Sequence, residues 1–456
     1  MTLVEQLGNW INEFRAGEIP PDVESQASLL ILDSVGCALA AVPESTSQAT
    51  IRAVEQLGGI PECTIIGTST HTSAANAVLA NGALIRTLDL NDLYWGPGSG
   101  GHPSDNIAVG LAVGEQQASS GRDALTAIIM GYELYCRLQD LAPESSPWDH
   151  VTASSLVAPA VAGRLMGLTT DQLSHALAFS VAHGNTLEAV RRGQLSTAKS
   201  LANALVAHTG VVATALAAQG LTGPLGVLEG PRGFGHVVLA GADLSQLIAP
   251  VEGQYRLMSV SIKAYPCIGT AQSAVAAALQ ARVSFGGPMN QIDSVEVRMA
   301  DLPEVRAQVG DEERRHPTTR EAADHSFYYL LAVSLLDGEM TPRQFENHRW
   351  LDSSVNELMN RISIRTDASL NIYTPGSFPC VLRVSTRDGK TWQVEAPYPP
   401  GHPRNRMSAA DVEKKFASYT EKMLDKPRRA AIIQMIKGLR DAPSLRHLMH
   451  HLEART

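Results

Sequence analysis

The sequence predicts a mainly α protein that consists of a large all-helical domain and a smaller α+β domain. Three observations lead to this prediction. The first half of the 456-residue chain repeats apolar residues at helical spacing, with short breaks that contain Gly or Pro. Aromatic residues make up only 5% of the chain, and long stretches rich in Ala and Leu favour closely packed helices. After about residue 250, alternating runs typical of strands appear between the helical ones.

The helical part begins with an amphipathic run, MTLVEQLGNWINEF, and continues after Pro21-Asp22 with the apolar run SQASLLILDSVGCALA. The step Thr169-Thr170-Asp171-Gln172 is a helix-start signal, because a Thr followed three residues later by Gln can cap a helix. The expected elements are helices at 1–14, 25–40 and 72–88, a short strand at 63–67, and further helices from 107 to about 248.

The α+β part contains the alternating runs IDSVEVRMA (292–300) and RISIRT (361–366) and the run VLRVSTRDGKTWQVEA (381–396), in which Asp388-Gly389 predicts a hairpin turn. Helical runs lie between them, at 270–283 and 325–338. The charged tail that starts at Met407 is expected to be helical again and to pack back on the first domain. We therefore assign residues 1–262 and 399–456 to the helical domain and residues 263–398 to the smaller domain, with the active cleft between them.

Charge and composition exclude several classes of partner. The formal charge is −9 without a basic stripe, so nucleic acid is not an expected partner. The uncharged stretch Ser200–Leu228 is long enough for a membrane span, but Asn203, His208 and Gln219 favour a helix buried in a soluble core. The N-terminus has no basic region followed by an apolar run, so we expect a cytoplasmic protein.

The sequence also predicts that no metal or organic cofactor is bound. Its cysteines are scattered and form no CxxC pair, which supports neither a disulfide framework nor a zinc or iron–sulfur site. The glycine-rich segment GPGSGG (96–101) follows a predicted helix and not a strand, so it does not predict a dinucleotide site, and the motifs GxxxxGK[ST], HExxH and GxSxG are missing from the chain. The five cysteines are Cys37, Cys63, Cys136, Cys267 and Cys380.

The segment 89–106, DLNDLYWGPGSGGHPSDN, is the strongest candidate for a functional loop. It is too rich in Gly, Pro, Asn and Asp for regular structure, and it lies between two apolar helices. His102, between Gly101 and Pro103, is a candidate acid or base, because His titrates near neutrality. An ordinary loop histidine bonded to nearby backbone is the alternative.

Two further residues, both lysines, suggest a site for an anion. Lys199 is the only charge before a long uncharged run, so it either extends its amine to solvent or meets an anion. The same argument applies to Lys263, and together the two suggest a cationic pocket for a polycarboxylate or phosphate. His150, just before an apolar helix, is either functional or part of a helix cap at Asp149 or Thr152. Tyr328-Tyr329 is typical of a core helix.

Five blocks in the same order resemble the MmgE/PrpD family over roughly residues 25–415. They are LDLNDLYWGPGSGGHPSDN, PWDHVT followed by VAGRLMGL, RRGQLSTAKSLANALVAHTG, SIKAYPCIGTAQSAVAAAL and TREAADHSFYYLLAVSLLDG. Five collinear blocks are far more specific than any single one. The family resemblance implies a helical domain with a smaller α+β lid, in agreement with the pattern of the sequence.

The resemblance implies metal-independent dehydration of 2-methylcitrate, or of a related 2-hydroxy tricarboxylate, to 2-methyl-cis-aconitate. Decarboxylation of cis-aconitate, or epimerisation or dehydration of a related acid, is the alternative, and a non-catalytic carboxylate-binding relative is a second one. A homodimer is also implied. The chain departs from the family at Leu93, where a small polar residue such as Thr is common. By resemblance the catalytic residues are Asp89, His102 and His150, and the substrate-binding residues are Lys199, Lys263 and Tyr329.

Overall fold

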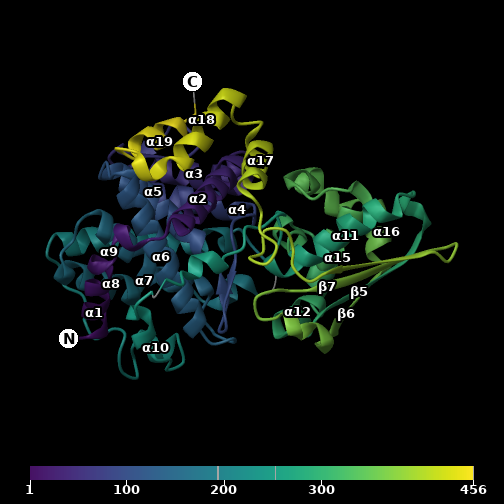
Figure 1. Ribbon diagram of the computed structural model, residues 1–456, viewed down its shortest axis with the longest axis horizontal. Helices are drawn as coiled ribbons and strands as arrows, with labels where there is room; N and C mark the ends of the chain where they lie inside the picture. The colour runs from purple at the N-terminus through teal and green to yellow at the C-terminus, as the bar shows by residue number, and fades with distance from the viewer. Residues whose placement is uncertain (193–194, 252, 455–456) are drawn as a thin grey trace.

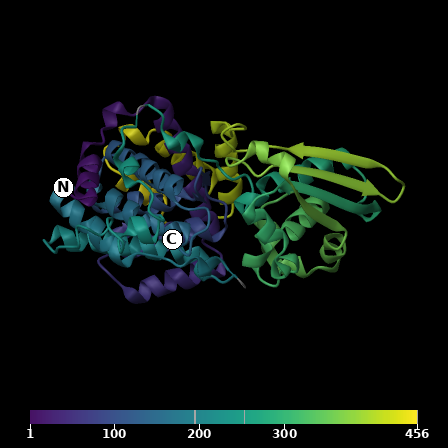
Figure 2. The ribbon, with the colours of Figure 1, turned by 90° about the horizontal axis from the view of Figure 1, so that it is seen from below.

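The buried side chains form two large hydrophobic cores, and the chain crosses between them twice. The computed structural model describes residues 1–192, 195–251 and 253–454. One core draws on residues from Val4 to Ile262 and again from Val412 to Leu452, and the other on residues from Cys267 to Ala396. Figures 1 and 2 show two lobes side by side that correspond to these cores. The predicted fold class, mainly helical with a smaller α+β domain, is confirmed.

Most of the helices lie in the first lobe, and the longer strands lie in the second. The first lobe contains α1 (Leu3–Glu13), α2 (Pro21–Ala41), α3 (Ser45–Leu57), α4 (Ala74–Thr87), α5 (Ile107–Gln116), α6 (Gly121–Leu141), α7 (Ser154–Leu165), α8 (Thr170–His183), α9 (Ala198–Ala218), α10 (Phe234–Val237), α17 (Ala409–Thr420), α18 (Lys426–Lys437) and α19 (Arg446–His451). The second contains α11 (Gln272–Phe285), α12 (Pro303–Val309), α13 (Glu312–Arg315), α14 (Arg320–Ala323), α15 (Phe327–Asp337) and α16 (Ser353–Met359).

Small residues let the helices of the first lobe pack closely. Helix α9 lies against α4, α7 and α8. A Cβ atom at Gly210 of α9 would lie 2.7 Å from the Cβ of Ala158 in α7, so glycine is needed at this crossing. Helices α2 and α9 are long and apolar enough to cross a membrane, but 72% and 56% of their apolar windows are buried inside the protein. Asn203 and His208 of the uncharged stretch thus lie on a helix that is partly packed against other helices, and Gln219 follows its last residue.

The helix-start signal at Thr169 is confirmed by the cap of α8. The Thr169 side chain accepts from the backbone N–H of Gln172, and the Gln172 side chain accepts from the backbone N–H of Thr169. The reciprocal pair satisfies two backbone donors that a helix start leaves without partners. The same arrangement joins Thr2 and Glu5 at α1, where the sequence predicts an amphipathic helix.

The second lobe is built on a four-stranded sheet with the order β6-β5-β7-β8. Strand β5 (Ile292–Ala300) pairs parallel with β6 (Ile362–Asp367) and antiparallel with β7 (Cys380–Thr386), which forms a hairpin with β8 (Thr391–Ala396). The predicted turn is confirmed, since Gly389 adopts a φ of 83° in it. Helices α11 and α15 pack together, and α11 covers β7 and β8. All three predicted strand runs are therefore present.

The strand predicted at 63–67 is shorter than expected. It is reduced to β1 (Cys63–Thr64), which pairs with β2 (His71–Thr72). The loop 89–106 is irregular as predicted, apart from β3 (Tyr94–Trp95), which pairs with β4 (Gly100–Gly101), and a short 3-10 helix at Pro103–Asn106.

The charged tail forms two long helices where the sequence suggests one continuous run. Asp425 caps α18 by accepting from the backbone N–H of Arg428, and Pro427 lies in the first turn, so the chain is interrupted after α17. Helix α17 packs on α2 of the first lobe, as expected, and lies at the boundary of the two lobes (Figure 1).

The two crossing segments pair with each other and with the functional loop. Ser261 pairs with Leu93, and the backbone N–H of Ile262 donates to the carbonyl of Gly401 over 3.0 Å. Gly401 has a φ of 87°, and a Cβ there would overlap the carbonyl oxygen of Ile262. This glycine therefore allows the outgoing and returning chains to touch at the boundary.

Candidate active site

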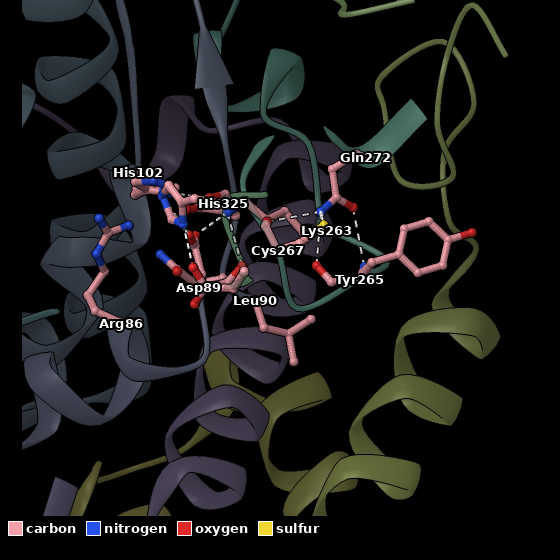
Figure 3. A network of polar contacts seen from close by, with 12 residues as sticks. Arg86, Asp89, Leu90, His102, Lys263, Tyr265, Cys267, Gln272 and His325 are labelled. Atoms are coloured by element: carbon pink, nitrogen blue, oxygen red, sulfur yellow. Dashed lines mark hydrogen bonds and ion pairs between the residues drawn. The ribbon is translucent and has the colours of Figure 1, made fainter. Parts of the chain in front are cut away.

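Asp89 lies at the centre of a buried cluster of charges where the two lobes meet (Figure 3). It begins the loop after α4 and has a φ of 49°, in the left-handed region that residues other than Gly, Asn and Asp seldom adopt. Such backbone strain is more frequent at functional sites than elsewhere. The unusual backbone turns the Asp89 carboxylate towards residues from both lobes.

Two lysines from distant parts of the chain bind the two oxygens of this carboxylate. Lys199 of α9 donates to Asp89 Oδ2 over 3.0 Å, and Lys263 donates to Asp89 Oδ1 and, over 3.0 Å, to the Asp89 carbonyl. Burial opposes ionisation of Asp89, but the two ammonium groups outweigh it and hold the pKa of Asp89 well below its usual value. The interpretation that Lys199 extends to solvent is wrong, since its side chain is only 6% exposed.

Gln272 of α11 holds the short turn that carries Lys263. Its side-chain oxygen accepts from the backbone N–H groups of Ala264 and Tyr265, over 3.1 and 3.2 Å. Its amide nitrogen donates to the carbonyls of Tyr265 and Cys267 (Figure 3). A single side chain from the second lobe thus fixes the backbone just after Lys263.

A third basic residue, His325, completes the cluster from the second lobe. His325 Nε2 lies 3.5 Å from Asp89 Oδ2, and its Nδ1 lies 3.2 Å from the ammonium of Lys199 and in contact with Asp324. Burial and the Lys199 charge lower the pKa of His325 to about 4. Sequence reasoning missed this histidine. The available signal was an Asp-His pair directly before Ser326, the residue that caps α15.

His102 and His150 lie together, with ring centroids 5.3 Å apart, and Tyr135 of α6 joins them. The Tyr135 hydroxyl accepts from the backbone N–H of His102 over 3.1 Å and lies 3.0 Å from His150 Nδ1. Burial lowers the pKa of His102 well below its ordinary value and that of His150 to about 3, so both rings are neutral at pH 7. His102 also lies near enough to Asp89 for their charges to interact.

Hydrogen bonds assign different tautomers to the two rings. His102 Nδ1 lies 2.5 Å from the backbone carbonyl of Asp92, which can only accept, so Nδ1 carries the proton and Nε2 has a free lone pair. Among the described residues the Tyr135 hydroxyl proton has no acceptor other than Nδ1 of His150, 3.0 Å away, so we assign the donor role to Tyr135 and the His150 proton to Nε2. His102 is therefore suited to take up a proton and His150 to deliver one.

A capped turn and an ion pair fix the backbone that carries His150. Asp149 accepts from the backbone N–H of Val151 over 3.0 Å and caps the short 3-10 helix His150–Ala153. Burial opposes ionisation of Asp149, but Arg191 outweighs it and lowers the Asp149 pKa to about 2. Of the two capping residues considered for this turn, Asp149 is the one that caps.

Asp92 fixes the loop between Asp89 and His102. Its carboxylate accepts from the backbone N–H and hydroxyl of Ser104 and from the hydroxyl of Tyr132. Burial raises the pKa of Asp92 to about 7 despite these bonds. The network holds the two ends of the loop together, so that the Asp92 carbonyl stays on His102.

The structure brings Asp89, His102, His150, Lys199 and Lys263 into one region, but it places Tyr329 elsewhere. Tyr329 is fully buried in α15, its hydroxyl donates to the carbonyl of Gln344, and its ring packs against Phe345. Its described contacts are typical of a core residue, the alternative that the sequence left open for this tyrosine pair. His325, four residues earlier, is the side chain that reaches Asp89.

Leu93 lies at the boundary of the lobes, next to a cavity that also touches Lys263. A Cβ at Gly269 would lie 2.5 Å from Cδ2 of Leu93, so the leucine packs directly on the second lobe. Residues of both lobes surround this cavity, among them Leu93, Lys263, Gln272, Ser273, Phe378 and His402. Lys263 is the only one of the predicted site residues that lines this small cavity, so the active cleft between the domains stays a prediction.

One group of side chains has the spacing of a metal site. Asp89, Asp324 and His325 each offer a ligand atom, and these atoms lie within 4.8 Å of one another. Lys199 already contacts both carboxylates, and Lys263 contacts that of Asp89. A divalent cation here would meet two buried ammonium groups, which is unfavourable in a low dielectric. The expectation that no metal binds stays a prediction.

Comparisons with known proteins relate most of the chain to one family. A model of the MmgE/PrpD N-terminal domain matches residues 5–247, and a model of the MmgE/PrpD C-terminal domain matches residues 265–441. A cis-aconitate decarboxylase of Homo sapiens is 25% identical and covers 96% of this chain and 92% of its own. A 2-methylcitrate dehydratase of Cupriavidus necator is 27% identical over 88% of this chain and 87% of its own. For the 2-methylcitrate dehydratase of Escherichia coli (strain K12), the values are 26%, 84% and 82%.

Proposed function

Because this chain belongs to the MmgE/PrpD family, we propose that it is a lyase that removes water from 2-methylcitrate, or from a closely related 2-hydroxy tricarboxylate. The product would be 2-methyl-cis-aconitate or its analogue. Relatives that cover most of the chain are dehydratases and decarboxylases of such acids. The observation that carries the proposal is the pair of neutral histidines with opposite tautomers beside two buried ammonium groups.

Dehydration needs a base and an acid in the same site. The lone pair on His102 Nε2 takes the proton from the carbon next to a substrate carboxylate, and the electron pair of that C–H bond becomes the new double bond. The hydroxyl on the neighbouring carbon accepts the Nε2 proton of His150 and leaves as water. Positioned acids and bases each contribute about 10²–10⁴-fold to such reactions.

The lysines stabilise the charge that develops during proton removal. Lys263 uses two of its three N–H donors on Asp89, which leaves the third for a substrate carboxylate. The negative charge that spreads into this carboxylate is then stabilised by an ammonium group in a water-poor site. Asp89, whose pKa is held low, pairs with both lysines and holds them in place, and it does not act as the base.

Decarboxylation of cis-aconitate is the second candidate. It is favoured by the cis-aconitate decarboxylases of Homo sapiens and Mus musculus, which cover 96% and 80% of this chain. Loss of CO₂ leaves a carbanion that the same lysines would stabilise, and only an acid is then needed to protonate carbon. The paired tautomers favour dehydration because that reaction uses both histidines.

Proton NMR of the purified protein against 2-methylcitrate, citrate and cis-aconitate tests the proposal. We expect 2-methylcitrate signals to be replaced by those of 2-methyl-cis-aconitate, at the same rate with and without a chelator. Formation of itaconate from cis-aconitate would make the decarboxylase the correct assignment. Thermal stabilisation by these acids without any product would indicate a carboxylate-binding relative. Loss of activity in the chelator would contradict the metal-independent reaction.

We also propose that the protein is a homodimer, as the family resemblance implies. Light scattering of the purified protein measures this directly, since one chain has a mass of 48.7 kDa. A mass of one chain at micromolar concentration would contradict the proposal.

A further inference from the structure

Lys415 of α17 has a buried side chain that contacts neither His102 nor His150. It binds backbone carbonyls of the candidate site instead. This side chain carries a charge, yet only 7% of its surface is exposed to solvent. Its ammonium pairs with the carboxylate of Asp33 in α2. It also donates to the carbonyl of Leu90 over 3.1 Å and to that of Lys263 over 2.6 Å. One ammonium thus joins four segments that are far apart in the sequence.

Both carbonyls belong to the backbone that carries the centre of the candidate site. Leu90 directly follows Asp89, and Lys263 is the residue whose ammonium binds the Asp89 carboxylate. Figure 3 shows Leu90, Asp89 and Lys263 next to one another. Lys415 therefore binds the backbone of both segments that provide the Asp89–Lys263 pair.

The segments that contain Asp89 and Lys263 are far apart in the sequence, so the sequence does not by itself fix their relative position. Asp89 follows α4 of the first lobe, and Lys263 lies on the segment that crosses to the second lobe. The backbone pairing of Leu93 with Ser261 holds them at one point, and Lys415 adds two charge-assisted hydrogen bonds at another. Two attachment points restrict rotation of one segment against the other, which a single point does not.

We propose that Lys415 is a positioning residue that sets the geometry of the Asp89–Lys263 pair through the carbonyls of Leu90 and Lys263. Asp33 balances its charge, because an unpaired ammonium in this position would be costly to bury. The inference rests on the proposed function, in which Lys263 stabilises the developing charge. Displacement of catalytic groups by about 1 Å can reduce turnover about 10²-fold.

The test separates the carbonyl bonds of Lys415 from its ion pair. Lys415→Met alone leaves the Asp33 carboxylate buried without its cation, so it is expected to lower both stability and turnover. The double variant Lys415→Met with Asp33→Asn removes both charges and restores a neutral interior. We expect kcat of the double variant to fall about 10- to 100-fold, with KM changed less than about threefold. The acid limb of its pH profile should not move, because His102 is untouched.

Two further variants serve as controls. Asp33→Asn removes the counter-charge of Lys415 and is expected to lower stability, but it keeps the bonds from Lys415 to both carbonyls, so kcat of the folded variant is expected to stay within about threefold of the wild type. Lys414→Met changes the exposed lysine next to Lys415 on the same helix and should leave kcat unchanged. Asp33→Asn keeps the proposal testable even if the double variant does not fold.

The outcomes distinguish this inference from the proposed function. A folded double variant with wild-type kcat would overturn the positioning role, and so would a loss in Asp33→Asn as large as that in Lys415→Met. Wild-type protein that converts none of the tested acids would instead contradict the proposed function.

Discussion

The two histidines of the candidate site are neutral for the same reason but carry their protons on different nitrogens. Burial disfavours the charged form of both, and hydrogen bonds then select the tautomer. A backbone carbonyl that can only accept decides for His102, and the hydroxyl of Tyr135 decides for His150. The division of labour between acid and base therefore depends on two atoms outside the rings.

His102→Ala should reduce turnover at least about 100-fold and leave the fold intact, because it removes the proposed base. His183→Ala is the matched control, since His183 is exposed at the end of α8 and should not affect turnover. Steady-state kinetics with the acid that the wild type converts, together with the melting temperature, measures both effects. Near-normal turnover in the folded His102 variant would contradict its role.

The pH dependence of kcat/KM follows from the burial of His102. The base acts in its neutral form, so activity is lost as the pH falls through the pKa of His102. Burial holds that pKa well below the ordinary 6.5, so kcat/KM should stay level down to about pH 6.5 and fall only at lower pH. An acid limb centred at or above about pH 6.5 would contradict this assignment. The groups that face His102 are Asp92, Tyr135, His150, Arg86, Lys263 and Asp89.

At the scale of elements, short pieces of backbone place the site. Strand β4 brings Gly101 against the hydrogen bond between Tyr135 and His150. Helix α6 supplies Tyr132 and Tyr135, one for each end of the functional loop. The loop is therefore held by a neighbouring helix as well as by its own turns, which limits how far it can move.

Gly101→Ala tests this close approach of the loop to α6. A Cβ at Gly101 would lie 2.3 Å from the Tyr135 hydroxyl oxygen and 3.0 Å from His150 Nδ1, so one of these groups must move. We expect about 1–3 kcal/mol of destabilisation and a marked loss of turnover. Gly17→Ala, at a site with open space around it, should change neither. Unchanged kinetics in Gly101→Ala would show that the tyrosine contact is dispensable.

At the scale of the whole molecule, the site depends on both lobes. Asp89, His102, His150 and Lys199 come from the first lobe, Lys263 from the crossing segment, and Asp324 and His325 from the second. A ligand that fills the site therefore binds only when the lobes are assembled.

A tricarboxylate should accordingly stabilise the folded protein against heat. At a concentration of about 100 times Kd, binding adds about 2.7 kcal/mol to the free energy of unfolding. Differential scanning fluorimetry with 2-methylcitrate and citrate measures the rise in Tm. Lys263→Met should abolish the rise, whereas Lys414→Met should keep it. A shift that persists in Lys263→Met would place the acid elsewhere.

The sequence by itself determined the fold class, the strands at 292–300 and 381–396, and the loop that contains Asp89 and His102. Periodicity and turn residues are local properties of the sequence, so they can be recognised without knowledge of the fold. His325 and Lys415 were out of reach, because the partners that join them to the site lie 126 or more residues away in sequence, although His325 also contacts its neighbour Asp324. The motif predicted that Tyr329 binds substrate. The position of a residue in a motif does not tell which acceptor its buried hydroxyl meets in the folded protein. Tertiary structure alone decided which carboxylate the lysines meet and which nitrogen of each histidine holds the proton, because both depend on contacts between distant segments.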